Sequence, residues 1–259
     1  MTLAQRIISI IQQHGAAVVN KKGVWIMKIT IIYDNKIAKD IKGLKAGWGF
    51  SCFIQTKEKN ILFDTGWDGD MLVSNMQLLG FSPQDIDLAV ISHNHWDHCG
   101  GLARVLNLNK NLEVYVPKSF SNHLKKEIKK RANVFCEVQQ SKEIYPGIYT
   151  TGEIEGSLLI GKTRISIKEQ SLIFSTAKGL VAITGCAHSG INKIVNSANK
   201  LGNIYGLMGG FHDFKEYNLL RNINLIVPTH CTANKKKIMS LFPKNCLEVG
   251  VGFQVDFQD

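Results

Sequence analysis

The sequence lacks the long apolar runs of membrane-spanning proteins and the paired cysteines of disulfide-stapled ones. No apolar stretch in its 259 residues approaches the ~18–20 residues that a membrane-spanning helix needs. The six cysteines are scattered without paired spacing, which favours reduced thiols over a disulfide framework. We therefore expect no membrane span and a cytoplasmic location.

The amino-terminal stretch also lacks the features of a secretory signal. Its apolar segment Ile7–Ile11 is interrupted by Ser9, and no small-residue cleavage pattern follows. Leu3, Ile7 and Ile11 fall at helical spacing, which predicts a short amphipathic helix. Residues 1–26 are accordingly interpreted as an N-terminal extension.

No linker or low-complexity stretch divides the rest of the chain. Hydrophobic residues make up 44% and charged residues 20%, which is typical of a folded globular protein. We expect residues 27–259 to form a single domain.

The formal net charge of +10 raises the question of an anionic partner. Lysines gather at 125–131 and 235–237, where they are typical of solvated helix faces. No aromatic residues interleave them, as a surface that stacks nucleic-acid bases would require. The composition thus predicts a small anionic substrate and no nucleic-acid partner, and it leaves homo-oligomer formation open.

Hydrophobic periodicity predicts a chain in which early strands are followed by alternating strands and helices. Helices are expected at 70–79, 101–106, 121–131, 191–200 and 233–241. Strands are expected at 28–33, 50–55, 61–63, 88–91, 113–116, 144–150, 158–160, 164–167, 172–174, 180–184, 204–207 and 225–227. This order favours an α/β fold in which two sheets form a sandwich covered by helices.

One segment concentrates residues that bind metal ions. The apolar strand expected at 88–91 is followed at once by His93, His95, Asp97 and His98. Three imidazoles this close would repel one another as cations, whereas a divalent metal ion stabilises their neutral forms. His93 and His95 can converge on one ion, and Asp97 and His98 on a second.

Three further histidines follow predicted strands and are flanked by small residues. They are His188 in Gly185–Gly190, His212 after Gly209 and Gly210, and His230 in Pro228–Thr232. A single histidine at a strand end is more often a structural residue than a ligand. Together with the first cluster, however, the three support a metal site.

These motifs resemble a known family. His93-x-His95-x-Asp97-His98 followed by Gly100 and Gly101 resembles the signature of the metallo-β-lactamase superfamily, and Asp64 resembles its preceding aspartate motif. The histidine motifs near 188, 212 and 230 are similar to a branch of 7,8-dihydropterin-6-methyl-4-(β-D-ribofuranosyl)aminobenzene 5'-phosphate synthase-like proteins. The resemblance implies an αββα sandwich, with two mixed sheets flanked by helices and a metal site along one edge.

The resemblance also implies a set of metal ligands. These would be His93, His95, Asp97, His98, His188 and His230. They would hold two divalent ions, for which zinc is favoured and manganese or iron are the alternatives. Asp64 would support a ligand imidazole by a hydrogen bond.

One expected ligand is absent. The superfamily usually carries an aspartate that bridges the two metals and is preceded by a glycine, but no such Gly-Asp pair occurs here. Cys186, which follows Gly185, has a comparable context. It either bridges the metals or simply packs in the core, in which case the site lacks a bridge.

The predicted chemistry is hydrolysis by a hydroxide held between two metal ions, which attacks a phosphorus or carbonyl centre. Asp97 would orient this nucleophile. His212 would protonate the leaving group or hold the substrate's anion, unless it is only structural. Ser189 and Gly190 precede a predicted helix, so we expect Ser189 to cap it and its amide end to bind a phosphate. A small phosphoester, such as a phosphodiester or a pterin-type phosphate, is therefore the favoured substrate.

Four alternatives remain open at this stage. A carboxylic ester, lactone or thioester hydrolase would use the same metal site. An iron-dependent redox enzyme is less favoured, because that branch of the family has a carboxylate where His95 stands. A nuclease is less favoured because such relatives usually carry an added substrate-binding module, and a catalytically idle scaffold because it need not keep all six histidine and aspartate ligands.

Overall fold

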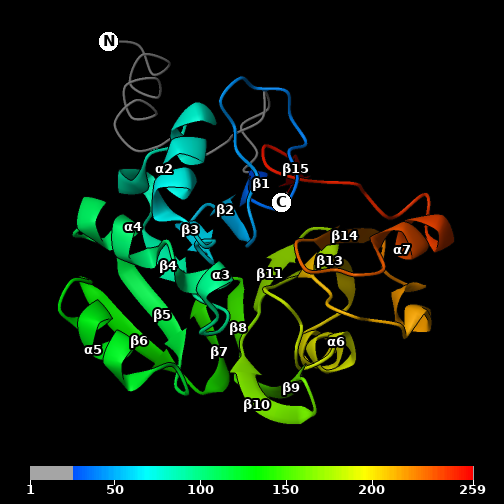
Figure 1. Cartoon of the computed structure of the whole chain (residues 1–259). Coiled ribbons are helices and arrows are strands. Elements are labelled where there is room, and N and C mark those ends of the chain that lie inside the picture. The colour runs from blue at the N-terminus through cyan, green and yellow to red at the C-terminus, as the bar shows by residue number, and fades with distance from the viewer. Residues whose placement is uncertain (1–25, 259) are drawn as a thin grey trace.

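The computed structural model describes residues 26–258, which form two large sheets packed face to face (Figure 1). The predicted amphipathic helix of the N-terminal extension lies outside these residues. The first sheet has seven strands, in the order β15 (Gln254–Gln258), β1 (Ile26–Tyr33), β2 (Ser51–Gln55), β3 (Asn60–Phe63), β4 (Leu88–Val90), β5 (Glu113–Pro117) and β6 (Val134–Val138). The second has six, in the order β14 (Leu225–Thr229), β13 (Ile204–Gly210), β12 (Gly179–Thr184), β11 (Leu172–Thr176), β8 (Ile148–Gly152) and β7 (Gln140–Tyr145).

Helices cover the outer faces of both sheets (Figure 1). The first sheet is flanked by α2 (Gly69–Leu78), α4 (Leu102–Leu108) and α5 (Asn122–Lys129), and the second by α6 (Ile191–Asn199) and α7 (Lys235–Leu241). Two short 3-10 helices, η1 (Pro83–Asp85) and η2 (Tyr217–Leu220), lie in connections, and β9 (Ile154–Ile160) pairs with β10 (Thr163–Glu169) as a separate hairpin. The predicted αββα sandwich is confirmed. In the described residues, no helix combines the length and the apolar character needed to cross a membrane.

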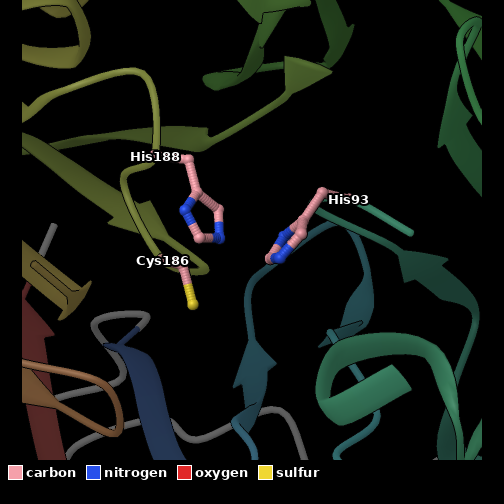
Figure 2. A group of neighbouring side chains, drawn as sticks. All are labelled: His93, Cys186 and His188. Atoms are coloured by element: carbon pink, nitrogen blue, oxygen red, sulfur yellow. The ribbon is translucent and has the colours of Figure 1, made fainter. Parts of the chain in front are cut away.

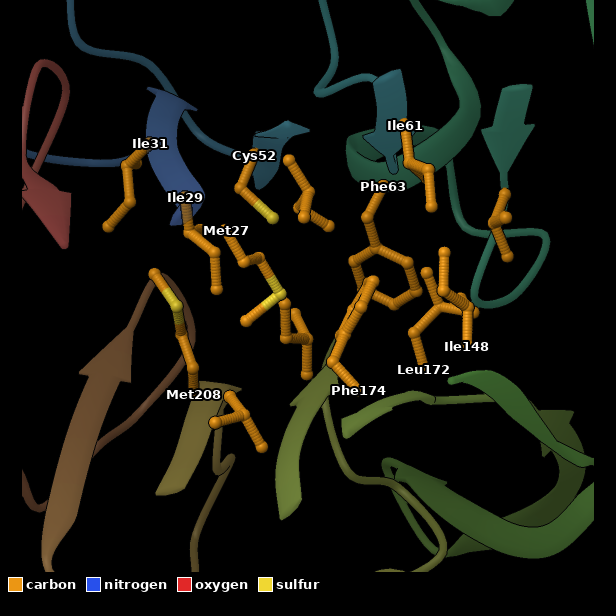
Figure 3. Close-up of a cluster of buried hydrophobic side chains, with 14 of the residues drawn as sticks. Met27, Ile29, Ile31, Cys52, Ile61, Phe63, Ile148, Leu172, Phe174 and Met208 are labelled. Atoms are coloured by element: carbon orange, nitrogen blue, oxygen red, sulfur yellow. The ribbon is translucent and has the colours of Figure 1, made fainter. Parts of the chain in front are cut away.

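Three apolar layers hold the sandwich together. The central layer joins the inner faces of the two sheets: Phe63 of the first sheet and Phe174 of the second are buried in it (Figure 3). A second layer packs the first sheet against its helices, and a third packs the second sheet against α6 and α7. Burial of this apolar surface is the main force that fixes the distance between the sheets.

Each sheet contains a run of parallel strands. β3, β4, β5 and β6 are parallel in the first sheet, and β12, β13 and β14 are parallel in the second. Parallel strands end at the same edge of their sheet, and α/β proteins commonly place their sites at that edge. The loops that follow β3, β4, β12, β13 and β14 therefore carry the residues of interest.

The secondary-structure prediction was wrong at 144–150. A tight turn at Pro146 and Gly147 divides this segment between β7 and β8, and Gly147 adopts a φ of 73°. The edge strands β6 and β15 were also missed: β6 is a short apolar segment, Val134–Val138, that was not recognised, and β15 alternates polar residues with Val255 and Phe257. The other predicted strands and all five predicted helices overlap the observed elements.

A buried amide ties the segment before β2 to the helical layer. Asn75, on α2, is fully buried, and its Nδ2 donates to the backbone carbonyls of Ile32 and Lys45 at 3.0 and 2.9 Å. Its Oδ1 accepts from the backbone N–H of Lys45 at 3.0 Å. All three contacts are lost if the side chain is shortened.

We expect Asn75→Ala to lower the free energy of unfolding by roughly 2–4 kcal/mol, because unpaired buried polar groups cost about 1–3 kcal/mol each. Chemical denaturation monitored by circular dichroism measures the change. The control is Gln77→Ala on the exposed side of α2, for which we expect a change within about 0.5 kcal/mol. Equal stabilities of the two variants would contradict this role for Asn75.

Candidate metal centre

Five strand ends from both sheets converge on one cluster of side chains. Asp64 follows β3, and the loop after β4 carries His93 and His95 and leads into α3 (Trp96–Cys99). From the second sheet, Cys186 and His188 follow β12, His212 follows β13, and His230 follows β14. The structure thus brings together residues that lie up to 166 positions apart.

Two groups of ligand atoms lie within this cluster. One contains His93, Cys186 and His188, and the other contains His98, Cys186 and His230; within each group the ligand atoms lie within 4.8 Å of one another. Figure 2 shows the imidazoles of His93 and His188 facing one another, with Cys186 on the same loop as His188. Both groups have the spacing that one bound metal ion requires.

The first group contains buried nitrogens that have no partner in the protein. Nε2 of His93 and both ring nitrogens of His188 make no hydrogen bond to the described residues. Burial, together with the neighbouring imidazoles, holds the pKa of His93 well below its ordinary value and lowers the pKa of His188 to about 3. Both rings are therefore neutral, which is the form that binds metal, and buried polar atoms without partners are rare in proteins. These residues fit a divalent metal ion.

Asp64 orients the imidazoles of the first sheet. Its carboxylate accepts hydrogen bonds from His98 Nδ1, from Ser92 Oγ and from the Ser92 backbone N–H, each at 2.7 Å. Ser92 Oγ in turn lies 2.8 Å from His93 Nδ1. Burial lowers the pKa of His98, but the adjacent Asp64 carboxylate outweighs this effect and raises it overall. Because Nδ1 of His98 is bound to Asp64, its Nε2 faces the cluster.

Asp97 lies beside the second group, close to two of its imidazoles. Nδ1 of His230 lies 2.9 Å from Asn35 Oδ1, and its Nε2 lies 3.0 Å from Asp97 Oδ2. The same Asp97 oxygen lies 3.7 Å from His98 Nε2. Although burial raises the pKa of Asp97, the imidazoles of His230 and His98 hold it well below its ordinary value. A cation bound by the Asp97 carboxylate and the His230 imidazole would satisfy both side chains.

His95 and His212 lie beside these groups. The His95 ring centroid is 4.6 Å from that of His93 and 5.0 Å from that of His188. The ring of His212 lies 4.9 Å from that of His188, and its side chain is 38% exposed. His95 is thus within reach of the first group, whereas His212 lies at the rim.

The predicted role of Ser189 as a helix cap is wrong. The N-cap of α6 is Gly190, at a φ of 93°, and it makes no side-chain cap bond. Ser189 instead donates its hydroxyl and backbone N–H to Glu169 Oε1, at 2.6 and 2.7 Å. Burial raises the pKa of the Glu169 carboxyl group. Through its two hydrogen bonds to Ser189, Glu169 anchors the loop 186–190.

A polar cavity of about 390 Å³ opens beside the cluster. His188 and His212 line it on the side of the cluster, and Ser189, Gly190 and the first residues of α6 form another wall. Two exposed lysines also line it, Lys193 and Lys215, together with Asp213 and Glu216. A polar molecule in this cavity would contact His188, one of the candidate ligands, and His212.

The backbone of the centre is strained. In the described residues, the non-glycine residues with positive φ are Asp64, Ala187, His212 and His230, at 56°, 53°, 47° and 36°. Each such residue costs roughly 1–3 kcal/mol, and such strain gathers at functional sites. All four belong to this centre.

Sequence reasoning missed four residues that support the ligands. Ser92, Asn35, Asp34 and Glu169 hold ligands or ligand loops through hydrogen bonds, and Asp34 Oδ2 accepts the backbone N–H of His230 at 2.7 Å. Asp34 and Asn35 directly follow the first predicted strand, and polar residues at a strand end could have been recognised as candidates for the site. Glu169 lies 20 positions from its partner Ser189, and no local pattern indicates that contact.

Comparison with known proteins agrees with this geometry. The family model of the metallo-β-lactamase superfamily matches residues 48–158. A 7,8-dihydropterin-6-methyl-4-(β-D-ribofuranosyl)-aminobenzene-5'-phosphate synthase of Methanocaldococcus jannaschii is 29% identical over 222 residues, which cover 68% of this chain and 76% of that protein.

Solved structures show the same fold. Tm1679, a metal-dependent hydrolase of the beta-lactamase superfamily, matches with a TM-score of 0.68 and 25% identity, over 90% of this chain and 100% of that one. The metallo-beta-lactamase fold protein YhfI of Bacillus subtilis matches with a TM-score of 0.62 and 14% identity, over 89% and 99%. The match over residues 48–158, the sandwich fold and the clustered histidines thus make the chain similar to proteins of the metallo-β-lactamase superfamily.

Proposed function

We propose that this protein is a hydrolase that uses two divalent metal ions, with zinc favoured, to cleave a phosphoester of a small anionic molecule. The observation that carries the proposal is the polar cavity, because His188 and His212 of the histidine cluster line it together with two lysines, Lys193 and Lys215. A substrate anion in this cavity would lie beside His188, one of the proposed metal ligands.

The ligands divide between two positions. His93, His95 and His188 would hold one ion, and Asp97, His98 and His230 the other, with Cys186 between them. Ions bound there would supply Lewis-acid polarisation of the scissile group and activation of a water molecule. Asp64 holds the His98 ring in place for metal binding, because its carboxylate accepts a hydrogen bond from His98 Nδ1.

Two side chains would handle the reacting groups. Asp97 is ionised, because the pKa of its carboxyl group is low, so its free oxygen can accept a hydrogen bond from the attacking water and orient it. His212 lies at the rim, beside His188 and facing the cavity, where it can give a proton to the leaving oxygen.

The cavity also has the chemistry of an anion site. Backbone N–H groups of the first turn of α6 and the ammonium groups of Lys193 and Lys215 can bind a phosphate. The similar synthase of M. jannaschii is named for a 5'-phosphate product, which supports a phosphorylated substrate here.

A carboxylic ester or lactone is the second candidate substrate. An apolar groove of about 210 Å³ lies between α3, α4 and α5. The exposed Trp96 lines it together with Leu106, Phe120 and Leu124. This groove would suit the acyl chain of such a substrate better than it suits a phosphate.

We expect the protein loaded with zinc or manganese to hydrolyse a chromogenic phosphodiester, and a chelator to abolish the activity. His95→Ala should lower kcat/KM by at least about 100-fold, since it removes a ligand from the proposed reaction centre. Initial rates at fixed metal concentration measure both effects.

The matched control for this assay is His123→Ala, which removes an exposed imidazole on α5 and should leave the rate unchanged. Turnover of a lactone or thioester but not of the phosphodiester would favour the second candidate. Full activity of His95→Ala would refute the proposed ligand set.

We expect Asp64→Asn to weaken zinc binding by about 10–100-fold, because the groups that orient ligand imidazoles contribute this much to metal affinity. Competition against a chromophoric zinc chelator gives the dissociation constants. Asp70→Asn, which changes an exposed carboxylate at the start of α2, serves as the control. Equal zinc affinities in the two variants would show that Asp64 does not act on the metal.

A further inference from the structure

The two groups of candidate ligands share one residue, Cys186. Its Sγ lies within 4.8 Å of ligand nitrogens in both groups, and its thiol donates to His98 Nε2 at 3.0 Å. The side chain is buried, so its sulfur faces the cluster rather than solvent. No other residue in either group, as found in residues 26–258, belongs to both.

The backbone around Cys186 permits this position because glycines surround it. A Cβ on Gly185 would lie 2.2 Å from Ser92 Oγ and 3.0 Å from Asp64 Oδ2, so only glycine lets the end of β12 approach the ligands of the first sheet. A Cβ on Gly210 would likewise lie 2.5 Å from Gly185 O. Close backbone approach on both sides thus sets the position of the sulfur.

Neither group contains a carboxylate, although Asp97 lies beside the second. We propose that Cys186 binds as a thiolate to both metal ions and bridges them, in the position where the resemblance predicts an aspartate. This inference rests on the two-metal part of the proposed function, but it does not depend on the substrate.

The identity of the bridge bears on the choice of metal. Thiolate is a soft ligand that favours zinc or cobalt over manganese or magnesium, which prefer oxygen. Together with the surrounding imidazoles, a sulfur bridge makes both positions suited to zinc. A carboxylate bridge would not discriminate in this way.

A second cysteine lies close by and provides a matched control. Cys231, which directly follows His230, donates its thiol to the backbone carbonyl of Cys186 at 3.9 Å. Its sulfur is in neither ligand group. Removing Cys231 therefore removes a neighbouring thiol without removing the proposed bridge.

The test is a titration of the metal-free protein with cobalt(II), followed by the near-ultraviolet absorption band that arises from thiolate-to-cobalt charge transfer. If Cys186 bridges, the band grows through the second equivalent of cobalt, because both ions contact the sulfur. Cys231→Ser should keep the band, and Cys186→Ser should lose it. Cys186→Asp should bind two equivalents of cobalt, counted by elemental analysis, and show no band.

Other results would overturn the proposal. A band that stops growing after one equivalent would show that the sulfur contacts a single ion. A band that survives Cys186→Ser but disappears in Cys231→Ser would assign the thiolate to Cys231. Circular dichroism of each metal-free variant checks its folding, and the wild-type titration decides between one ion and two even if Cys186→Ser does not fold. Absence of phosphodiester hydrolysis would refute the proposed substrate and leave the cobalt result unaffected.

Discussion

The buried carboxylate of Asp64 is the interaction on which the centre depends. It lies at the end of β3 and accepts two hydrogen bonds from Ser92 in the loop after β4 and one from His98 in α3, so it joins two neighbouring strand ends and fixes the rings that face the cluster. A buried carboxylate is costly to desolvate unless it is fully paired. Ser92 and His98 supply that pairing, and in return they are held in one orientation. The geometry of the first-sheet ligands therefore follows from the need to satisfy one buried charge.

The centre also requires the ligand-bearing strand ends of the two sheets to lie close together. His93 and His98 come from the first sheet, whereas Cys186, His188 and His230 come from the second, and the apolar layer between the sheets determines how closely the two sets approach. Close packing in that layer leaves little freedom to adjust. Residues far from the ligands, such as Phe63 and Phe174, thus contribute to the spacing of the metal positions through packing alone.

Much of the fold and part of the centre could be predicted from the sequence. The His93–His98 segment is contiguous, follows a strongly apolar strand and carries a recognisable spacing, so its location at a strand end needed no tertiary information. The edge strand β15 gave little signal, because three of its five residues are polar, whereas the apolar edge strand β6 was simply not recognised. Glu169, Asp34 and Asn35 could not be assigned, since their partners lie 20 to 196 positions away and only the folded chain brings them together. Ser189 was assigned to the helix end by a local rule, but a buried carboxylate competes successfully for its hydroxyl.

The left-handed backbone at Asp64, Ala187, His212 and His230 restricts which substitutions evolution can accept at these positions. Glycine adopts that conformation without the penalty that a side chain meets, so a mutation to glycine at Ala187 would relieve strain in the folded chain. It would also let the loop that carries Cys186 and His188 sample other shapes. Stability of the fold and order of the centre therefore place opposite demands on position 187. The alanine found there corresponds to the better-ordered loop, at the cost of some strain.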